Sequence, residues 1–249
     1  MSKKVWLVTG CSKGLGKALV EELIAQGYPV AGTSRSKESL EKSIGAESDL
    51  FLPLSMNVKE EADVKKAIAQ ATEKFGRIDV VVNNAGFTHL ATIEEMSDAD
   101  AREEFDINVF GTLNVIRGAL PQMRAQGSGH IFNVSSLGAY NVGPLSGIYC
   151  ATKHAVKAIS ETLAQEVKAF GIHVTDVKPG FMKTEFFGSS HKTTAPEGSP
   201  YKHLYDENMK FYMGQNGNQA GDPKKAAKLY IKVAEMDEPY ESLPMGTDC

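Results

Sequence analysis

Residues 5–16, Val-Trp-Leu-Val-Thr-Gly-Cys-Ser-Lys-Gly-Leu-Gly, contain the pattern that decides the fold. The apolar run 5–8 predicts a short buried strand, and the glycine-rich turn 9–16 opens an amphipathic segment. Backbone N–H groups and the helix dipole at such a turn can hold a pyrophosphate. Glycine spacing alone also fits a tight turn that only permits close packing. The position of the turn in a strand–helix–strand unit favours the nucleotide-binding interpretation.

Strand-like and helix-like segments alternate along the rest of the chain. Short β-rich runs predict strands at 5–8, 29–33, 50–54, 78–82, 130–134 and 172–177, with a last strand at 242–245. Amphipathic segments predict helices at 15–25, 60–75, 98–125, 148–170 and 223–234. Several strands are apolar throughout, as expected when helices cover both faces of a parallel sheet. The alternation therefore predicts an α/β fold with a doubly wound parallel sheet.

Composition narrows the class of protein further. The 249 residues suit one core, so we expect a single domain spanning residues 1–249. A formal charge of −4 and the lack of a long Lys/Arg run argue against a nucleic-acid partner. Cys11, Cys150 and Cys249 lack metal-ligand spacing and are odd in number, which argues against a metal site or disulfide framework. With no signal peptide or membrane span evident, the sequence predicts a soluble, cytoplasmic protein.

The segment after the second predicted strand indicates the cofactor. Many dinucleotide-binding folds carry an acidic residue here for the ribose hydroxyls, but this chain reads Thr33-Ser34-Arg35-Ser36. Arg35 offers a bidentate guanidinium to a 2′-phosphate, and Lys13 in the glycine turn adds a second cation. The alternative is that both cations are solvated surface charges, as most Lys and Arg residues are. Two cations without an acid favour NADP(H).

Tyr149 and Lys153 form a candidate acid/base pair. On a helix, their spacing places the phenol and the ammonium on one face. A nearby ammonium favours a phenolate, so Lys153 is expected to lower the pKa of Tyr149. Alone, such a pair is more often a solvated pair on a helix surface. The position of Ser136 favours the catalytic interpretation, because Ser136 follows the predicted strand 130–134 at the sheet edge where open α/β folds bind ligands.

Together these elements resemble the short-chain dehydrogenase/reductase superfamily over most of the chain. The resemblance rests on the glycine turn 9–16, Asn83-Asn84-Ala85-Gly86, Asn108, Ser136, Tyr149 with Lys153, and Pro179-Gly180 with Thr184. It implies a Rossmann fold with strand order 3-2-1-4-5-6-7. Segments 108–115 and 147–153 are most similar to the branch of carbonyl reductases and hydroxysteroid dehydrogenase-like enzymes.

The resemblance implies a role for each catalytic candidate. Tyr149 would be the acid/base, and Ser136 would hydrogen-bond the substrate oxygen while hydride moves between the nicotinamide and a carbonyl or alcohol carbon. Asn108 would complete a water-linked proton relay. Lys153 would bind the nicotinamide ribose and lower the pKa of Tyr149. The adjacent Ser135 should point away, because side chains alternate along a strand.

The resemblance also implies a set of cofactor-binding residues. Asn57 departs from many relatives, which have Asp near the adenine, but an amide still donates and accepts hydrogen bonds. The Pro179-Gly180 turn and Thr184 would hold the carboxamide end. The expected cofactor-binding residues are Gly10, Ser12, Lys13, Gly14, Leu15, Gly16, Ser34, Arg35, Asn57, Val58, Asn84, Ala85, Gly86, Tyr149, Lys153, Pro179, Gly180 and Thr184.

The stretch 186–222 breaks the strand–helix pattern and reads as a long loop. It is rich in Gly, Ser, Asn and Pro, yet it carries the aromatic residues Phe186, Phe187, Tyr201, Tyr205, Phe211 and Tyr212. A substrate lid for a hydrophobic ketone or aldehyde and a structural flap packed on the core are equally consistent with this composition. The chain ends soon after the last predicted strand, so part of the substrate wall is expected to be missing or differently supplied.

Three functions remain in competition. The leading interpretation is an NADP(H)-dependent oxidoreductase acting on a small carbonyl or alcohol substrate. A catalytically silent NADP(H)-sensing protein of the same fold is the alternative, because fold alone does not establish function. An enzyme that uses the bound nucleotide for epimerisation or dehydration is the third. The long helices predicted at 98–125 and 148–170 are compatible with a homodimer, a homotetramer or a monomer.

Overall fold

The computed structural model describes residues 3–184, 186, 191–193, 195–215 and 217–248. Its strands are β1 (Trp6–Thr9), β2 (Val30–Ser34), β3 (Phe51–Ser55), β4 (Val80–Asn83), β5 (Thr88–Leu90), β6 (Gly129–Val134), β7 (Ile172–Pro179), β8 (His191–Thr193) and β9 (Ser242–Met245). Its α-helices are α1 (Gly14–Ala25), α2 (Lys37–Ser43), α3 (Glu61–Phe75), α4 (Asp98–Phe105), α5 (Gly111–Gln126), α6 (Gly147–Val167), α8 (Lys202–Gln215) and α9 (Pro223–Ala234). Among the described residues, no helix has both the length and the apolar composition needed to span a membrane.

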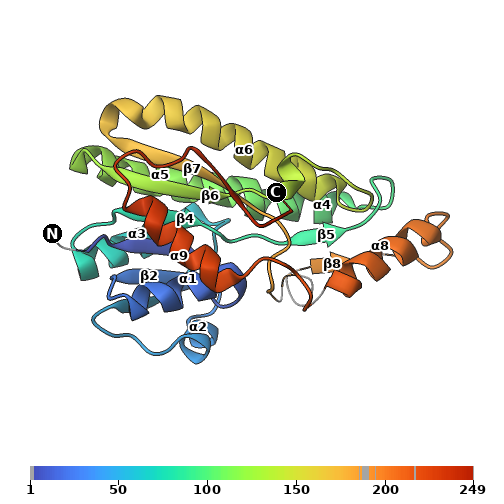
Figure 1. Cartoon of the computed structure of the whole chain (residues 1–249), viewed down its shortest axis with the longest axis horizontal. Coiled ribbons are helices and arrows are strands. Elements are labelled where there is room, and N and C mark those ends of the chain that lie inside the picture. Colours follow the sequence, from blue (N-terminus) through green and yellow to red (C-terminus); the bar gives the residue numbers. More distant parts are fainter. Residues whose placement is uncertain (1–2, 185, 187–190, 194, 216, 249) are drawn as a thin grey trace.

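The main sheet confirms the predicted doubly wound architecture. Its seven strands are parallel neighbours in the order β3-β2-β1-β4-β6-β7-β9, which is the expected 3-2-1-4-5-6-7 order once β5 and β8 are set aside (Figure 1). Trp6 of β1 pairs with Val30 on one side and with Val80 on the other. All strands of this sheet therefore present their carboxyl ends at the same edge.

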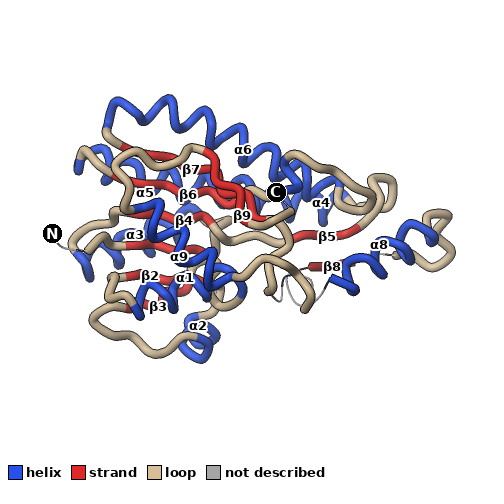
Figure 2. Tube along the Cα trace, in the orientation of Figure 1, coloured by secondary structure: helices blue, strands red, loops and turns tan. Residues whose placement is uncertain are grey.

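Helices cover both faces of the sheet (Figure 2). Strand β1 shows how the sequence sorts its side chains between them: Trp6 and Val8 pack with α1 and α9, whereas Leu7 packs with α3, α5 and α6. This alternation follows from the two-residue period of a strand. Because both faces are buried, the strands are apolar in unbroken succession, as the sequence indicated.

The helix predicted over 98–125 is not continuous. A single π-helical turn, Asp106–Phe110, separates α4 from α5. Such turns interrupt α-helices frequently at functional sites, and this one contains Asn108. Gly111 follows it because a Cβ there would lie 2.7 Å from Cγ2 of Val58, too close for any other residue. Periodicity alone cannot show a turn that adds only one residue to the repeat.

The prediction of a long loop over 186–222 was wrong for part of that stretch. Helix α8 occupies 202–215, and β8 forms a separate two-stranded parallel sheet with β5. Leu204, Tyr205, Met209 and Tyr212 recur at helical spacing and pack in a third apolar cluster. Polar residues between them hid the repeat in the sequence. Phe187, named with the aromatic residues of this stretch, lies outside the described residues.

Candidate active site

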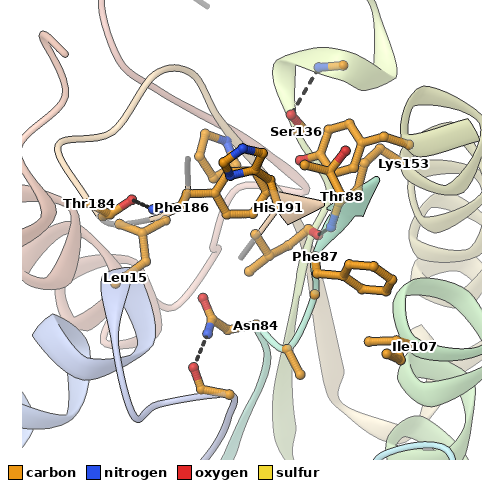
Figure 3. A pocket seen from close by; sticks show the side chains of 18 of the residues that line it. Leu15, Asn84, Phe87, Thr88, Ile107, Ser136, Lys153, Thr184, Phe186 and His191 are labelled. Carbon is orange, nitrogen blue, oxygen red and sulfur yellow. Dashed lines mark hydrogen bonds between the residues drawn. The ribbon is translucent and has the colours of Figure 1, made fainter. Parts of the chain in front are cut away.

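The carboxyl edge of the sheet opens onto one large cavity of about 630 Å³ (Figure 3). Its lining joins the glycine turn after β1, the segments after β2, β3, β4, β6 and β7, the start of α6, and parts of β8 and α8. All predicted site residues line this cavity except Gly16 and Asn108. The fold therefore brings segments from the whole length of the chain to one place.

The glycine turn is shaped by three different constraints. Gly10 and Gly14 have positive φ angles of 66° and 62°, which favour glycine. Gly16 is buried beneath the turn, where an added Cβ would lie 2.5 Å from Nδ2 of Asn84. Gly16 thus packs beneath the turn and does not line the cavity, and its expected place among the cofactor contacts stays a prediction. Gly14 faces the side chain of Thr184 across the cavity.

Asn84 has a bracing role that the sequence did not indicate. Its side-chain Nδ2 donates to the carbonyl oxygens of Thr9 and Gly10 at 2.9 and 3.0 Å. The hydroxyl of Thr9 in turn accepts from the backbone N–H groups of Asn84 and Ala85, each at 3.0 Å. The end of β4 therefore fixes the shape of the turn that follows β1, while Asn84, Ala85 and Gly86 also line the cavity.

The adenosine end of the cavity carries positive charge. Arg35 is exposed, and its guanidinium has no ion-pair partner among the residues that the structure describes. Lys13, the N-cap of α1, also lines this end. Asn57 is held by its own turn, where its Oδ1 accepts from the N–H of Lys59 at 3.3 Å. The glycine turn, the two cations and Asn57 thus lie at the same end of the cavity.

Ser136 and Tyr149 meet on the opposite wall, beside Gly138. A Cβ on Gly138 would lie 3.3 Å from Cε1 of Tyr149 and 3.5 Å from Oγ of Ser136, so a larger residue there would press on the Tyr149 ring. The Ser136 hydroxyl accepts from the N–H of Gly138 at 3.0 Å, which fixes its orientation. Ser135 points away, as expected, and its hydroxyl donates to the carbonyl oxygen of Val177 at 3.0 Å.

Burial has the largest effect on the pKa values of Tyr149 and Lys153. Withdrawal from water raises the pKa of Tyr149 above its ordinary value, and the nearby Ser136 hydroxyl only partly opposes this effect. The expected contribution of Lys153, which would lower this pKa, stays a prediction. Burial also lowers the pKa of Lys153 to about 8. The Lys153 ammonium donates to the carbonyl oxygen of Val134 at 2.8 Å and lies 5.6 Å from the centre of the Tyr149 ring.

Asn108 lies behind the cavity wall and acts as a clamp there. Its Oδ1 accepts from the N–H of Phe87 at 3.1 Å, and its Nδ2 donates to the carbonyl oxygen of Phe87 at 2.9 Å. The same Nδ2 also donates to Thr152 Oγ1 of α6 at 3.1 Å. The side chain of Asn108 is thus fully engaged in joining the π-helical turn to α6 and to the segment before β5. Its expected part in a proton relay stays a prediction.

The nicotinamide end is formed by the segment after β7. Gly180 N–H donates to the carbonyl oxygen of Met245, and Phe181 N–H donates to Oδ2 of Asp248 at 2.7 Å. The side chain of Asp248 lies directly over Gly180, where any Cβ would collide with it. The residues after β9 therefore fold back and support the Pro179-Gly180 turn. Cys249 lies outside the described residues.

The aromatic residues of 186–222 divide into two groups. Phe186, Phe211 and Tyr212 line the cavity, and the Phe186 ring lies 6.2 Å from that of Tyr149 (Figure 3). Tyr205 is instead buried in the third apolar cluster, with Tyr201 packed against it. Some aromatic residues of this stretch therefore anchor it to an apolar cluster, and others form part of the cavity wall. We refer to residues 186–222 as the cap.

Sequence reasoning missed two buried residues close to the site. His89 is buried, and its Nδ1 lies 3.3 Å from Oδ1 of Asp100. Glu104 is completely buried behind β5. Its position on the inner face of α4, four residues before Asn108, was the available signal, because charged residues rarely occupy such a face.

Comparison with known proteins defines the family. The family model described as short chain dehydrogenase matches residues 4–195. An oxidoreductase, BOA17, of Botryotinia fuckeliana is 35% identical over 246 residues, covering 98% of this chain and 89% of the relative. The crystal structure of a short-chain dehydrogenase from Streptomyces avermitilis is 34% identical with a TM-score of 0.88, covering 98% and 90% of the two chains. ElxO with NADP bound is 27% identical with a TM-score of 0.79, covering 98% and 97%.

The fold, the cavity at the sheet edge and these matches lead to one class. The chain belongs to the short-chain dehydrogenase/reductase family, and it is an oxidoreductase of that type.

Proposed function

We propose that this protein transfers a hydride between NADP(H) and a carbonyl or secondary alcohol carbon, with Tyr149 as proton donor and acceptor. One observation carries the proposal. Ser136, Tyr149 and Lys153 line one wall of the same cavity whose far end is formed by the glycine turn and Arg35. A substrate oxygen placed beside Ser136 and Tyr149 would have a hydrogen-bond donor and a proton source at one point.

The residues divide the reaction between them. When bound, the reduced nicotinamide supplies the hydride that the carbonyl carbon accepts. Tyr149 gives its phenolic proton to the carbonyl oxygen, while the Ser136 hydroxyl holds that oxygen and stabilises its developing charge. The Tyr149 phenol is protonated at neutral pH and can donate its proton, and burial raises its pKa further above neutrality. Lys153 would hold the nicotinamide ribose, and Asn108 would support the path by which the phenol regains its proton.

Preference for NADP(H) is argued from this chain's own residues. Proteins of this fold are found with either NADP or NAD, so the fold does not decide. Lys13 and Arg35 both line the adenosine end, and no carboxylate lines the cavity there among the described residues. A guanidinium without an ion-pair partner in the described chain is suited to a 2′-phosphate.

The other end of the cavity supports a hydrophobic ketone or aldehyde as substrate. Phe186, Phe211 and Tyr212 of the cap face Leu90 and Val142 across this end. An apolar and aromatic wall with few polar groups suits an apolar substrate body and leaves the carbonyl to Ser136 and Tyr149. This composition fits the carbonyl-reductase branch, and the cap would act as the substrate lid.

The test is a cofactor titration followed by a substrate panel. Purified protein is titrated separately with NADPH and NADH while nicotinamide fluorescence is followed, and the tighter complex is then mixed with aromatic, aliphatic and steroid ketones. We expect tighter binding of NADPH and loss of its absorbance with at least one ketone. Tighter binding of NADH would overturn the cofactor assignment. Binding of NADPH without consumption by any carbonyl would favour a nucleotide-sensing protein instead.

A further inference from the structure

A buried carboxyl lies directly behind the candidate active site. Glu104, in the last turn of α4, has none of its surface exposed. Its Oε1 accepts from the N–H of His89 at 3.4 Å, and the Thr88 hydroxyl is a second hydrogen-bond donor beside the carboxyl. Burying a carboxylate with so few hydrogen bonds is costly, so such a group persists only where a nearby cation or a function compensates.

The cation that faces Glu104 comes from α6. Glu104 and Asn108 lie four residues apart on the same side of the α4 and π-helical segment, so both face β5 and α6. Asn108 and Lys153 meet over Gly86, where an added Cβ would lie 3.1 Å from Oδ1 of Asn108 and 3.5 Å from Nζ of Lys153. Lys153 is itself almost completely buried, and its ammonium donates a hydrogen bond to the neutral carbonyl of Val134.

We propose that Glu104 is a positioning residue of the active site, whose buried carboxylate keeps the Lys153 ammonium charged beside Tyr149. The inference rests on the proposed role of Lys153. Neither His89 nor Thr88, the neighbours of Glu104 on β5, carries a fixed positive charge that could replace Lys153 as its partner. Glu104 does not line the cavity and would not touch substrate or cofactor.

Few other charged groups lie near Glu104 and Lys153 in the described part of the chain. Asp176 of β7 is the second buried carboxyl that acts on Lys153, but its Oδ2 lies 3.4 Å from Nζ of Lys178, which shares its charge. On the side of Glu104, the imidazole of His89 lies next to Asp100. Glu104, by contrast, has no cation within ion-pair distance among the described residues, so the Lys153 charge acts on it across the buried interior and not through a direct contact.

The protonation of the two groups agrees with this geometry. Burial raises the pKa of Glu104 to about 7, while the N–H of His89 and the charge of Lys153 oppose that rise. Burial lowers the pKa of Lys153 to about 8, and the Glu104 carboxylate opposes that fall. Each group therefore favours the charged form of the other, and both groups titrate close to neutral pH.

The experiment follows Lys153 by NMR in the full chain without cofactor or substrate. Lysine is labelled with ¹³C at Cε, and the Lys153 signal is assigned with Lys153→Met. In the wild type, we expect this signal to titrate near its own pKa of about 8 and to show a smaller step near 7, where Glu104 titrates. Absence of the smaller step would overturn the coupling without any need for a variant.

Two variants sharpen the result. Glu104→Gln should remove the smaller step and lower the midpoint of Lys153 by about one pH unit. Asp106→Asn removes an exposed carboxylate two residues away and should change neither. An unchanged midpoint in Glu104→Gln, or an equal shift in Asp106→Asn, would overturn the proposal. If Glu104→Gln does not fold, Glu104→Asp keeps the charge and should keep the smaller step.

A kinetic measurement connects the pair to catalysis. In Glu104→Gln, the alkaline limb of the pH profile of kcat should move to lower pH, in step with the Lys153 midpoint, whereas a purely structural role would lower kcat at every pH alike. The NMR result needs no turnover, so a chain that reduces no carbonyl would refute the proposed function and leave the Glu104–Lys153 coupling separately tested.

Discussion

The two ends of the cavity are built in different ways. The nucleotide end consists of segments that each follow a strand of the main sheet, braced by backbone hydrogen bonds such as those that Asn84 makes to Thr9 and Gly10. The substrate end consists of the cap and the segment 87–105, joined mainly by side chains. Tyr201 donates to Glu94 at 2.5 Å, and Lys192 lies 2.9 Å from Glu103.

Because of this difference, the nucleotide end is expected to be rigid, whereas the cap can vary. Parallel strands fix the positions of the segments that follow them, so the nucleotide end has little freedom once the sheet has formed. The cap touches the rest of the molecule through a short parallel pair, β5 and β8, and through tyrosines and surface ion pairs, which are individually weak. Substrate range can therefore change in the cap without disturbing the cofactor site.

The largest expected effect lies where the two ends meet. Tyr149→Phe removes the proton donor but keeps the ring, so kcat should fall by about a hundredfold to ten-thousandfold. NADPH affinity, measured by fluorescence titration, should change little. Tyr140→Phe alters an exposed tyrosine outside the cavity and should leave turnover unchanged. Unchanged turnover in Tyr149→Phe would remove the catalytic assignment.

The second effect concerns Glu104, which belongs to the segment 87–105 of the substrate end. A carboxyl with a raised pKa stabilises the fold fully only below its unfolded pKa, and that stability declines as pH rises toward its folded pKa of about 7. Glu104→Gln should therefore raise the free energy of unfolding at pH 8 by about 2–3 kcal/mol relative to its effect at pH 4. Urea unfolding at both pH values measures this. A pH-independent difference would contradict the raised pKa.

The third effect should be confined to the nucleotide end. Arg35→Asp replaces the guanidinium with a charge that repels a 2′-phosphate, so the ratio of NADPH to NADH affinity should fall by about ten- to a hundredfold. The KM for the ketone should stay nearly constant. Arg102→Asp, on the exposed side of α4, serves as the charge-matched control. A parallel loss of affinity for both cofactors would show that Arg35 does not recognise the phosphate.

The smallest effect should be confined to the cap. Tyr205→Phe loses the hydrogen bond to Glu95 at 2.9 Å and leaves the N–H of Thr92 without its acceptor, which should cost about 1 kcal/mol of stability and raise the KM for the ketone a few-fold. Cofactor affinity should not change. Tyr201→Phe, which loses only an exposed contact to Glu94, should show a smaller effect. An equal loss of cofactor affinity would contradict the independence of the two ends.

The sequence predicted the nucleotide end far better than the cap, and the reason is physical. Buried parallel strands and glycine turns carry strong local patterns, so β1, the turn 9–16 and α1 could be placed within a residue or two. Helix α8 is mostly exposed, and the polar residues between its apolar positions obscured the repeat. The pairing of β5 with β8 joins residues about a hundred positions apart and has no local signal.

The electrostatics of the site were the least predictable from the sequence. The spacing of Tyr149 and Lys153 indicated a lowered phenol pKa, yet the pKa depends on how much water the fold excludes, and burial raises it. Glu104 was overlooked for the same reason: its place on the inner face of α4 could be read from the sequence, but the groups that surround it there could not. Residue patterns place groups on faces, whereas desolvation depends on the whole packed structure.

The contact between α1 and α9 has a consequence for how the chain folds. Leu19 and Leu23 of α1 share one core with Tyr230 and Val233 of α9, so that core contains side chains from both ends of the sequence. A growing chain on the ribosome cannot complete it until the last segment has emerged. Until then, the apolar surfaces of the first strands and of α1 stay exposed. Chaperones that bind nascent chains would protect these surfaces during synthesis.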